Sequence, residues 1–147
     1  MLKRIHPILY LASSLAAIVF VTASASAAPV PAISFENATS SILAAYVVGY
    51  EFTPTVNISV TDLGFYDFGN DGIVDDHPVG IFRVSDQALV ASETILTTDP
   101  VIGGNAPNGY FRYHALGSPV TLAGGTAYRI TAVMLSTDAW PYAAFTN

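Results

Sequence analysis

The chain has no cysteine and few basic residues, and each shortage excludes a class of function. Without a single Cys among 147 residues, disulfide frameworks, thiolate metal sites and thiol chemistry are impossible. Lys and Arg together number 5 against 11 Asp and Glu, which gives a formal net charge of −6. This balance argues against nucleic acid and anionic membrane surfaces as partners, whereas it permits cations.

The first 27 residues have the three parts of a signal peptide. Lys3 and Arg4 precede an apolar run from Ile8 to Val21, and small residues then offer cleavage after Ala25 or, as we expect, after Ala27. The alternative, an uncleaved anchor helix, would need a longer apolar run and a firmer basic flank. We therefore expect a secreted or cell-surface protein with no stable membrane anchor after cleavage.

Removal of this leader makes the remaining chain more acidic. Two of the five basic residues are removed with it. Three basic residues then remain against eleven acidic ones, and the net charge becomes about −8. The remaining residues 28–147 are enough for one domain and hardly two.

Apolar residues in this part alternate with a period of two, which predicts strands rather than helices. The pattern is plainest in Tyr46–Phe52, where every second side chain is apolar or aromatic. Eight short strands at this spacing predict an all-β antiparallel β-sandwich, jelly-roll or Ig-like. The other seven expected strands are Ile33–Glu36, Asn57–Phe68, Val79–Val84, Leu89–Leu96, Tyr110–Leu116, Val120–Leu122 and Ala127–Leu135.

Finer features can also be predicted. The apolar phase slips within the third strand, which indicates a β-bulge near Thr61–Asp62. The segment Val79–Phe82 is apolar on both faces and should lie in the middle of a sheet. Ser85–Gln87 should turn into the next strand as a hairpin, and the Gly- and Pro-rich stretch Asp99–Asn108 should form a surface loop.

The order of several segments resembles a domain of unknown function found in exported bacterial proteins, many of which end in a PEP-CTERM sorting tail. The resemblance spans most of the mature chain and implies an extracellular β-sandwich in a surface or exopolysaccharide context. It rests on Gly49–Thr53, Ile58–Asp67, Asn70–Ile73, His77–Phe82, Leu89–Ser92, Gly109–Tyr113 and Pro119–Ile130.

The chain departs from this pattern at its end. A sorting tail would show Pro-Glu-Pro, an apolar span and a basic cluster, whereas the sequence stops at Trp140–Asn147 without them. It is similar to a C-terminally truncated member, and we expect one sheet edge to be left unpaired, which invites association or partial disorder.

The segment Asp67–His77, here called the acidic loop, is the most suggestive chemically. Asp67, Asn70, Asp71 and Asp75 could supply several oxygen ligands to calcium. The spacing does not fit an EF-hand, because Gly69 and Pro78 stand where such a loop needs an oxygen side chain and a Glu. The alternative is a hairpin tip whose Asn, Asp and Gly residues serve positive φ and Asx turns.

The two histidines of the mature part give no transition-metal pair. We expect His77 to pack at the start of a strand. His114 alternates with Arg112 on one strand face. Arg112 could bind a carboxylate through two hydrogen bonds, or it could belong to a solvent-exposed edge. We prefer the solvent-exposed edge.

Aromatic residues offer a second route to function, because sugar rings stack on Tyr and Trp. The candidates for binding extracellular polysaccharide are Trp140, Tyr142, Tyr110 and Tyr113, each of which could instead pack in a core. Tyr46, Tyr50 and Phe52 are expected to be core residues.

No nucleophile, base and acid arrangement is recognisable in the sequence, and acid pairs for glycoside hydrolysis cannot be judged without their separation in space. The sequence therefore favours a non-catalytic cell-surface or matrix module. A purely structural spacer and a secreted polysaccharide hydrolase are the alternatives.

Overall fold

The computed structural model describes residues 30, 32, 41–42, 44–102 and 110–141. Nine strands form in this part of the chain, and no helix does. They are β1 (Ser41–Ile42), β2 (Val47–Phe52), β3 (Ile58–Tyr66), β4 (His77–Arg83), β5 (Leu89–Ile95), β6 (Val101–Ile102), β7 (Phe111–Leu122), β8 (Tyr128–Val133) and β9 (Trp140–Pro141). The all-β prediction is confirmed.

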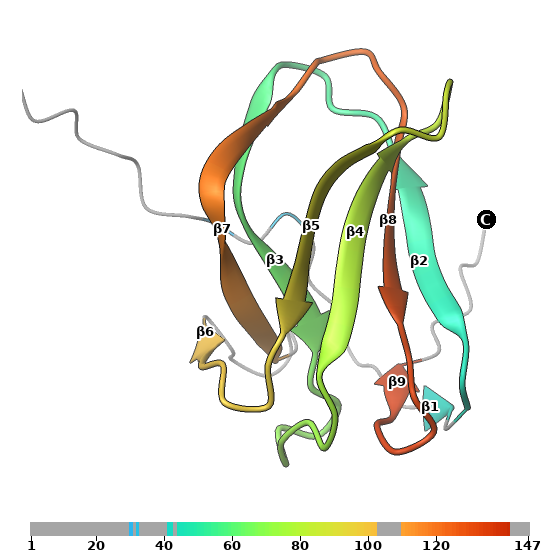
Figure 1. Cartoon of the computed structure of the whole chain (residues 1–147), viewed down its shortest axis with the longest axis vertical. Helices are drawn as coiled ribbons and strands as arrows, with labels where there is room; N and C mark the ends of the chain where they lie inside the picture. The colour runs from blue at the N-terminus through green and yellow to red at the C-terminus, as the bar shows by residue number, and fades with distance from the viewer. Residues whose placement is uncertain (1–29, 31, 33–40, 43, 103–109, 142–147) are drawn as a thin grey trace, which may run out of the picture.

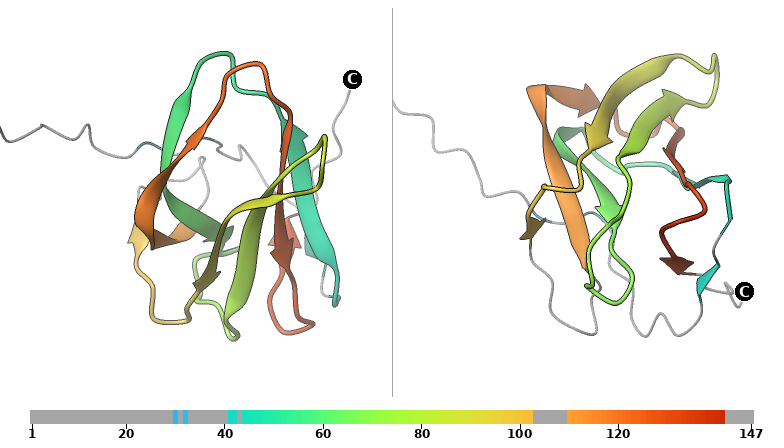
Figure 2. Two further views of the ribbon diagram at one scale, coloured as in Figure 1. Left: turned by 45° about the horizontal axis from the view of Figure 1, so that its top comes forward. Right: turned by 60° about the horizontal axis from the view of Figure 1, so that its bottom comes forward.

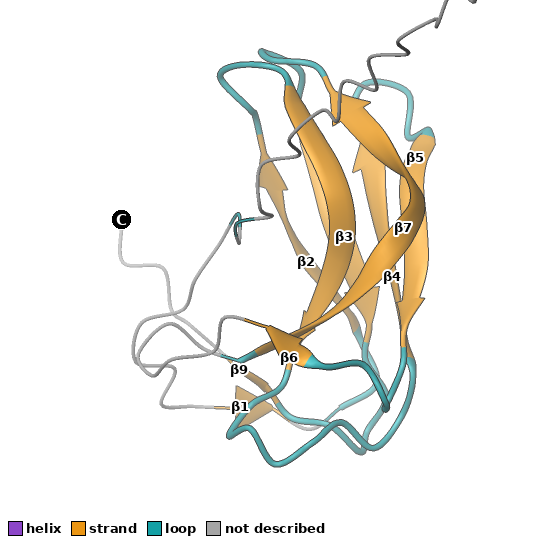
Figure 3. Ribbon diagram, turned by 90° about the vertical axis from the view of Figure 1, so that its left-hand side faces the viewer, coloured by secondary structure: helices purple, strands orange, loops and turns teal. Residues whose placement is uncertain are grey.

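All strand pairs are antiparallel, and they form three sheets (Figure 1). The larger sheet has the order β2-β8-β4-β5, a second has the order β3-β7-β6, and β1 pairs with β9. The side view in Figure 3 shows the two larger sheets lying face to face, with β3 and β7 in front of β2, β4 and β5. Among the described residues, no helix has the length and apolar character needed to cross a membrane.

The hydrophobic core lies between these two sheets, because their strands turn apolar side chains toward each other. Its buried members come from both sheets, which is why burial of apolar surface holds the sheets together. They are Leu63, Phe65, Ile73, Val79, Ile81, Ala91, Ile95, Leu122, Tyr128, Ala132 and Met134.

The finer sequence predictions can be compared with this arrangement. The register of β3 against β7 shifts between Val60 and Asp62, which confirms the bulge. Strand β4 lies between β8 and β5, as its two apolar faces predict. The β4–β5 turn is confirmed as well: Gln87 adopts a positive φ of 59°, and Asp86 accepts a hydrogen bond from the backbone of Ala88 at 3.2 Å.

Other strand predictions were wrong in detail. The two strands expected at 110–116 and 120–122 are one continuous strand, β7, because Gly117–Pro119 continues in extended conformation. Val101–Ile102 pairs with β7 as β6, inside the expected surface loop. The strand expected at 33–36 lies outside the described residues.

Of the three aromatic residues expected in the core, one is exposed. Tyr46 precedes β2 and keeps 55% of its surface in water, because it lies beyond the end of the core. Phe52 packs partly buried against the core, and Tyr50 is half-buried.

The connections gather at the two ends of the structure (Figure 2). At one end, the β2–β3 and β7–β8 connections are tied together by hydrogen bonds from Gly125 N to Pro54 O (2.7 Å) and from Gly124 N to Asn57 Oδ1 (3.0 Å). At the opposite end lie the acidic loop between β3 and β4, the β5–β6 connection and the β8–β9 connection (Figure 1). The candidate site is at this second end.

Candidate functional site

The acidic loop is shaped by residues that tolerate positive φ. Gly69, Asn70 and Gly72 have φ values of 85°, 56° and 101°. Glycine adopts this region at no steric cost and asparagine is among the few other residues that visit it readily. The positive φ values expected of a turn are therefore confirmed, but the hairpin was wrong, because β3 pairs with β7 whereas β4 pairs with β8 and β5 in the other sheet.

Asp67 begins the loop as a buried anchor. Its Oδ2 accepts hydrogen bonds from Nε and from a terminal nitrogen of Arg112 on β7, at 2.9 and 2.8 Å, and its Oδ1 accepts from the backbone N–H of Gly72 at 3.2 Å. Only 1% of its side chain is exposed. The reading of Arg112 as a carboxylate holder is correct, and the preferred solvated edge was wrong.

The same arginine reaches the neighbouring β5–β6 connection. Its third nitrogen donates to the carbonyl oxygen of Asp99 at 2.7 Å. The Asp99 carboxylate in turn faces Nδ1 of His114 at 2.9 Å and accepts from the backbone of Leu96 at 2.8 Å. Arg112 therefore joins two loops across one strand, which fixes the guanidinium in place.

Asp138, in the connection from β8 to β9, holds the second half of the acidic loop. Its carboxylate accepts hydrogen bonds from the backbone N–H groups of Val74 (2.8 and 3.0 Å) and Asp75 (3.1 Å). Oδ2 also lies 2.9 Å from Nε2 of His77. These bonds join residues more than sixty positions apart in the chain.

His77 is sealed at the start of β4, as the sequence predicted. It is 0% exposed, its ring stacks on Phe65 with centroids 3.7 Å apart and planes 4° apart, and its Nδ1 lies 2.9 Å from the carbonyl oxygen of Val133. Nδ1 donates to this carbonyl, which can only accept, and Nε2 shares a hydrogen bond with the carboxyl group of Asp138. Both ring nitrogens of His77 are thus engaged by fixed partners, which leaves neither for acid–base work on a ligand.

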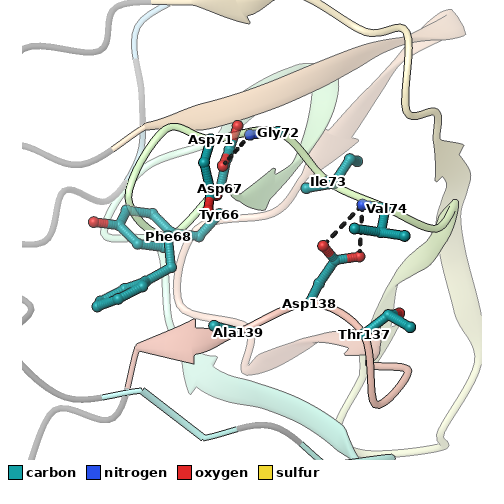
Figure 4. Close-up of a pocket in the computed structure, with 10 residues that line it drawn as sticks. All are labelled: Tyr66, Asp67, Phe68, Asp71, Gly72, Ile73, Val74, Thr137, Asp138 and Ala139. Atoms are coloured by element: carbon teal, nitrogen blue, oxygen red, sulfur yellow. Dashed lines mark hydrogen bonds between the residues drawn. The ribbon is translucent and has the colours of Figure 1, made fainter.

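Between the acidic loop and the β8–β9 connection lies a cleft of about 340 Å³ (Figure 4). Tyr66, Asp67, Phe68 and Asp71 lie together on one side of it, and Asp138 and Thr137 lie across from them (Figure 4). Phe68 is half-buried and Asp71 is exposed. The residues that line the cleft are Tyr66, Asp67, Phe68, Asp71, Gly72, Ile73, Val74, Thr137, Asp138 and Ala139.

The four residues predicted to hold calcium occupy different environments. Asp67 is buried against Arg112, Asn70 and Asp71 are exposed, and the half-buried Asp75 accepts a short hydrogen bond from the Thr137 hydroxyl. Within the described residues, no three acidic or histidine side chains are grouped so as to hold a metal ion. Calcium at this loop stays a prediction.

The four predicted ligand-binding aromatics are also dispersed. Tyr113 lies on β7 with its ring against Gly64, where a Cβ would meet the ring at 2.6 Å, and Tyr110 is half-buried just before β7. Trp140 lies in β9, whose backbone pairs with β1, and Tyr142 lies outside the described residues.

Tyr113 belongs to a run of four rings on β3, β7 and the start of the acidic loop, here called the aromatic run: Phe68, Tyr66, Phe111 and Tyr113. Successive centroids are 6.5, 5.1 and 5.8 Å apart. Tyr66 and Phe111 are buried, whereas the two end members are half-buried. Tyr66, Phe68 and Phe111 were not nominated from the sequence, because cross-strand pairing assembles the run.

Burial first, and then the proximity of Tyr50 and Asp62, raises the pKa of Tyr113 to about 12. Burial also raises the pKa of Tyr66, with smaller contributions from Tyr110 and Asp67. Both phenols therefore remain neutral hydrogen-bond donors at physiological pH.

No protein-family model, curated protein or solved structure gives a significant match to the chain.

Proposed function

We propose that the protein is an exported, non-catalytic β-sandwich module that binds carbohydrate at the cell surface or in the extracellular matrix. The observation that carries this proposal is the cleft of Figure 4, which is lined both by the half-buried aromatic residue Phe68 and by the exposed carboxylate residue Asp71. A sugar ring offers an apolar face for stacking and hydroxyl groups that donate to a carboxylate, so it matches both features.

The aromatic run offers further rings next to the cleft. Phe68 and Tyr113 stand at its two ends, and the pairing of β3 with β7 fixes their spacing through Tyr66 and Phe111. A polysaccharide that stacks on Phe68 would have a second aromatic platform at Tyr113. Rings fixed by strand pairing lose little conformational freedom on binding, which favours affinity for a flexible chain.

A binding role fits the cleft better than catalysis does. Glycoside hydrolysis needs two carboxyl groups able to act on the substrate. Two of the carboxylates that line the cleft, those of Asp67 and Asp138, already accept hydrogen bonds from Arg112, His77 and backbone N–H groups. Asp71 is the lining carboxylate that remains for a ligand.

The test is affinity electrophoresis of the exported protein through a panel of bacterial exopolysaccharides. The variants Phe68→Ala and Asp71→Ala should abolish retardation without changing the unfolding midpoint. Tyr46→Ala is the control, because it removes a more exposed aromatic ring that lies just before β2, in the other sheet's half of the sandwich. If all three variants bind like the parent protein, the cleft is not the site, and if no polysaccharide retards the parent protein, the spacer role stands.

Export is a separate part of the proposal. The leader at residues 1–27 and the resemblance to exported bacterial domains support it. Mass spectrometry of the protein recovered outside the cytoplasm should give a chain that begins at Ala28. A chain that retains Met1 through Ala27 and stays with the membrane fraction would replace the signal peptide by an anchor.

A further inference from the structure

Strand β2 is an outer strand of the four-stranded sheet, and among the described residues it pairs only with β8 (Figure 1). Tyr46 O accepts a hydrogen bond from Met134 N at 2.7 Å, one step before the start of the strand. Hydrogen-bonded and non-hydrogen-bonded pairs alternate along an antiparallel ladder. Val48, Tyr50 and Phe52 therefore bond to β8, whereas the N–H and C=O groups of Val47, Gly49 and Glu51 point away from it.

The other outer strands carry features that discourage further pairing. Strand β3 contains a bulge and a charged residue, Asp62. The ladder that holds β5 is irregular between Ile81 and Phe82, and β5 carries Glu93. Strand β6 has only two residues. Bulges, charges and short length are the usual protections of a sheet edge.

Strand β2 has no bulge and is six residues long. It contains no proline, no lysine and no register shift, and its single charge, Glu51, already pairs with Arg129 at 2.9 Å. Exposed apolar side chains gather beside its first residue: 55% of Tyr46, 67% of Val47 and 38% of Val133 are accessible. An outer strand without a register shift is a template for another strand.

We propose that β2 pairs antiparallel with β2 of a second copy of this chain, about a two-fold axis at Gly49. The outward-pointing N–H and C=O groups of Gly49 then bond to those of Gly49 in the second copy, and the groups of Val47 bond to those of Glu51 in the second copy. On the inward face, Val48 stands opposite Tyr50 of the second copy. No like charges stand opposite each other, and the β-branched and aromatic pair is a favourable cross-strand combination.

A second copy of this chain is the partner that fits the edge of β2. A two-fold interface requires a self-complementary surface, and this register pairs every residue from Val47 to Glu51 with a compatible one. It also completes the core, since the inward side chains Val48 and Phe52 pack against the core but remain only partly buried. The proposal is independent of carbohydrate binding, because the cleft is formed by other strands and loops.

Sedimentation velocity on the exported protein tests the pairing through charge. Val47→Glu places a carboxylate opposite Glu51 of the second copy at two symmetric positions, and we expect it to weaken dimerisation about tenfold. Val47→Lys should preserve or tighten the dimer. Val133→Glu is the control: it adds the same charge to the same exposed patch but lies on β8, away from the edge.

Hydrogen exchange supplies a second readout that does not depend on variants. The amides of Val47, Gly49 and Glu51 should become protected as the protein concentration rises, whereas those of Val48 and Tyr50 should be protected at every concentration. A monomer at the highest soluble concentration overturns the proposal. So does a dimer that Val133→Glu weakens as much as Val47→Glu, or one that forms without protection of the odd-numbered amides.

Discussion

Replacing Asp138 by alanine should be among the most damaging single changes to the described domain. The carboxylate is 7% exposed and accepts hydrogen bonds from two backbone N–H groups and from a fully buried His77. Its removal leaves two backbone N–H groups and a buried ring nitrogen of His77 without their partner, and at about 1–3 kcal/mol for each unsatisfied buried group the total cost should be about 3–5 kcal/mol. At about 4 °C for each kcal/mol, the unfolding midpoint should fall by about 12–20 °C.

Two further variants separate the ion pair from simple loss of a side chain. Asp138→Asn keeps one acceptor for the loop, and its amide can donate to a neutral His77 ring, so it should cost only about 1–2 kcal/mol. Asp76→Ala removes an exposed carboxylate that accepts one backbone hydrogen bond from Thr97 at 2.9 Å, and it should cost less than about 1 kcal/mol.

The assay is urea unfolding of all three variants and the parent protein, followed by circular dichroism. Nitrogen NMR of His77 complements it, because it counts the protons on the ring and so decides whether the pair with Asp138 is charged or neutral. A loss for Asp138→Ala no greater than that for Asp76→Ala would refute the buried ion pair. A ring with a single proton would show that the pair is neutral.

Three other predictions follow from the geometry. Gly49→Ala should lower the unfolding midpoint by disrupting the pairing of β2 with β8, since a Cβ there would lie 2.0 Å from Ile130 O. Gly117→Ala is the control: no atom lies within 4 Å of a Cβ at this position, so the midpoint should stay nearly unchanged. The pKa of Tyr113 is about 12 in the folded state, against an ordinary value of 10.0. This difference contributes stability that is fully present below about pH 10 and is lost as the pH rises to 12. In urea unfolding at about pH 9 to 12, replacing Tyr113 by phenylalanine should flatten that loss of stability. Calcium followed by excess chelator tests the predicted calcium site by the unfolding midpoint: a shift that Asp71→Ala removes would establish the site, and no shift at saturating calcium would leave the loop as a turn.

Local patterns predicted much of the fold. Alternation of apolar residues predicts most strands because side chains on a strand alternate between the core and the outside, whatever the partner strand is. The phase slip at Thr61 predicts the bulge for the same reason. Two-residue strands such as β1 and β9 have no such pattern, since they depend only on each other for pairing.

The site was predicted only in part. The acidic loop, the buried His77 and the alternative of Arg112 as a carboxylate holder are readable from residue types and spacing. Asp138 was not nominated, because a single aspartate after a strand carries no local signal of what it holds. Nothing in the sequence near Phe68 indicates that Thr137 and Ala139 form the opposite wall of its cleft.

The sequence by itself determined the class of the protein: an acidic, cysteine-free, all-β chain whose turns are placed by Gly, Asn, Asp and Pro. These properties depend on composition and on neighbours within a few residues. Only the tertiary structure decided which carboxylates are already engaged, which rings form the aromatic run and which strand is an outer edge. Those outcomes depend on contacts between distant segments, such as Asp138 with Val74, and such contacts leave no mark on the residues that separate them.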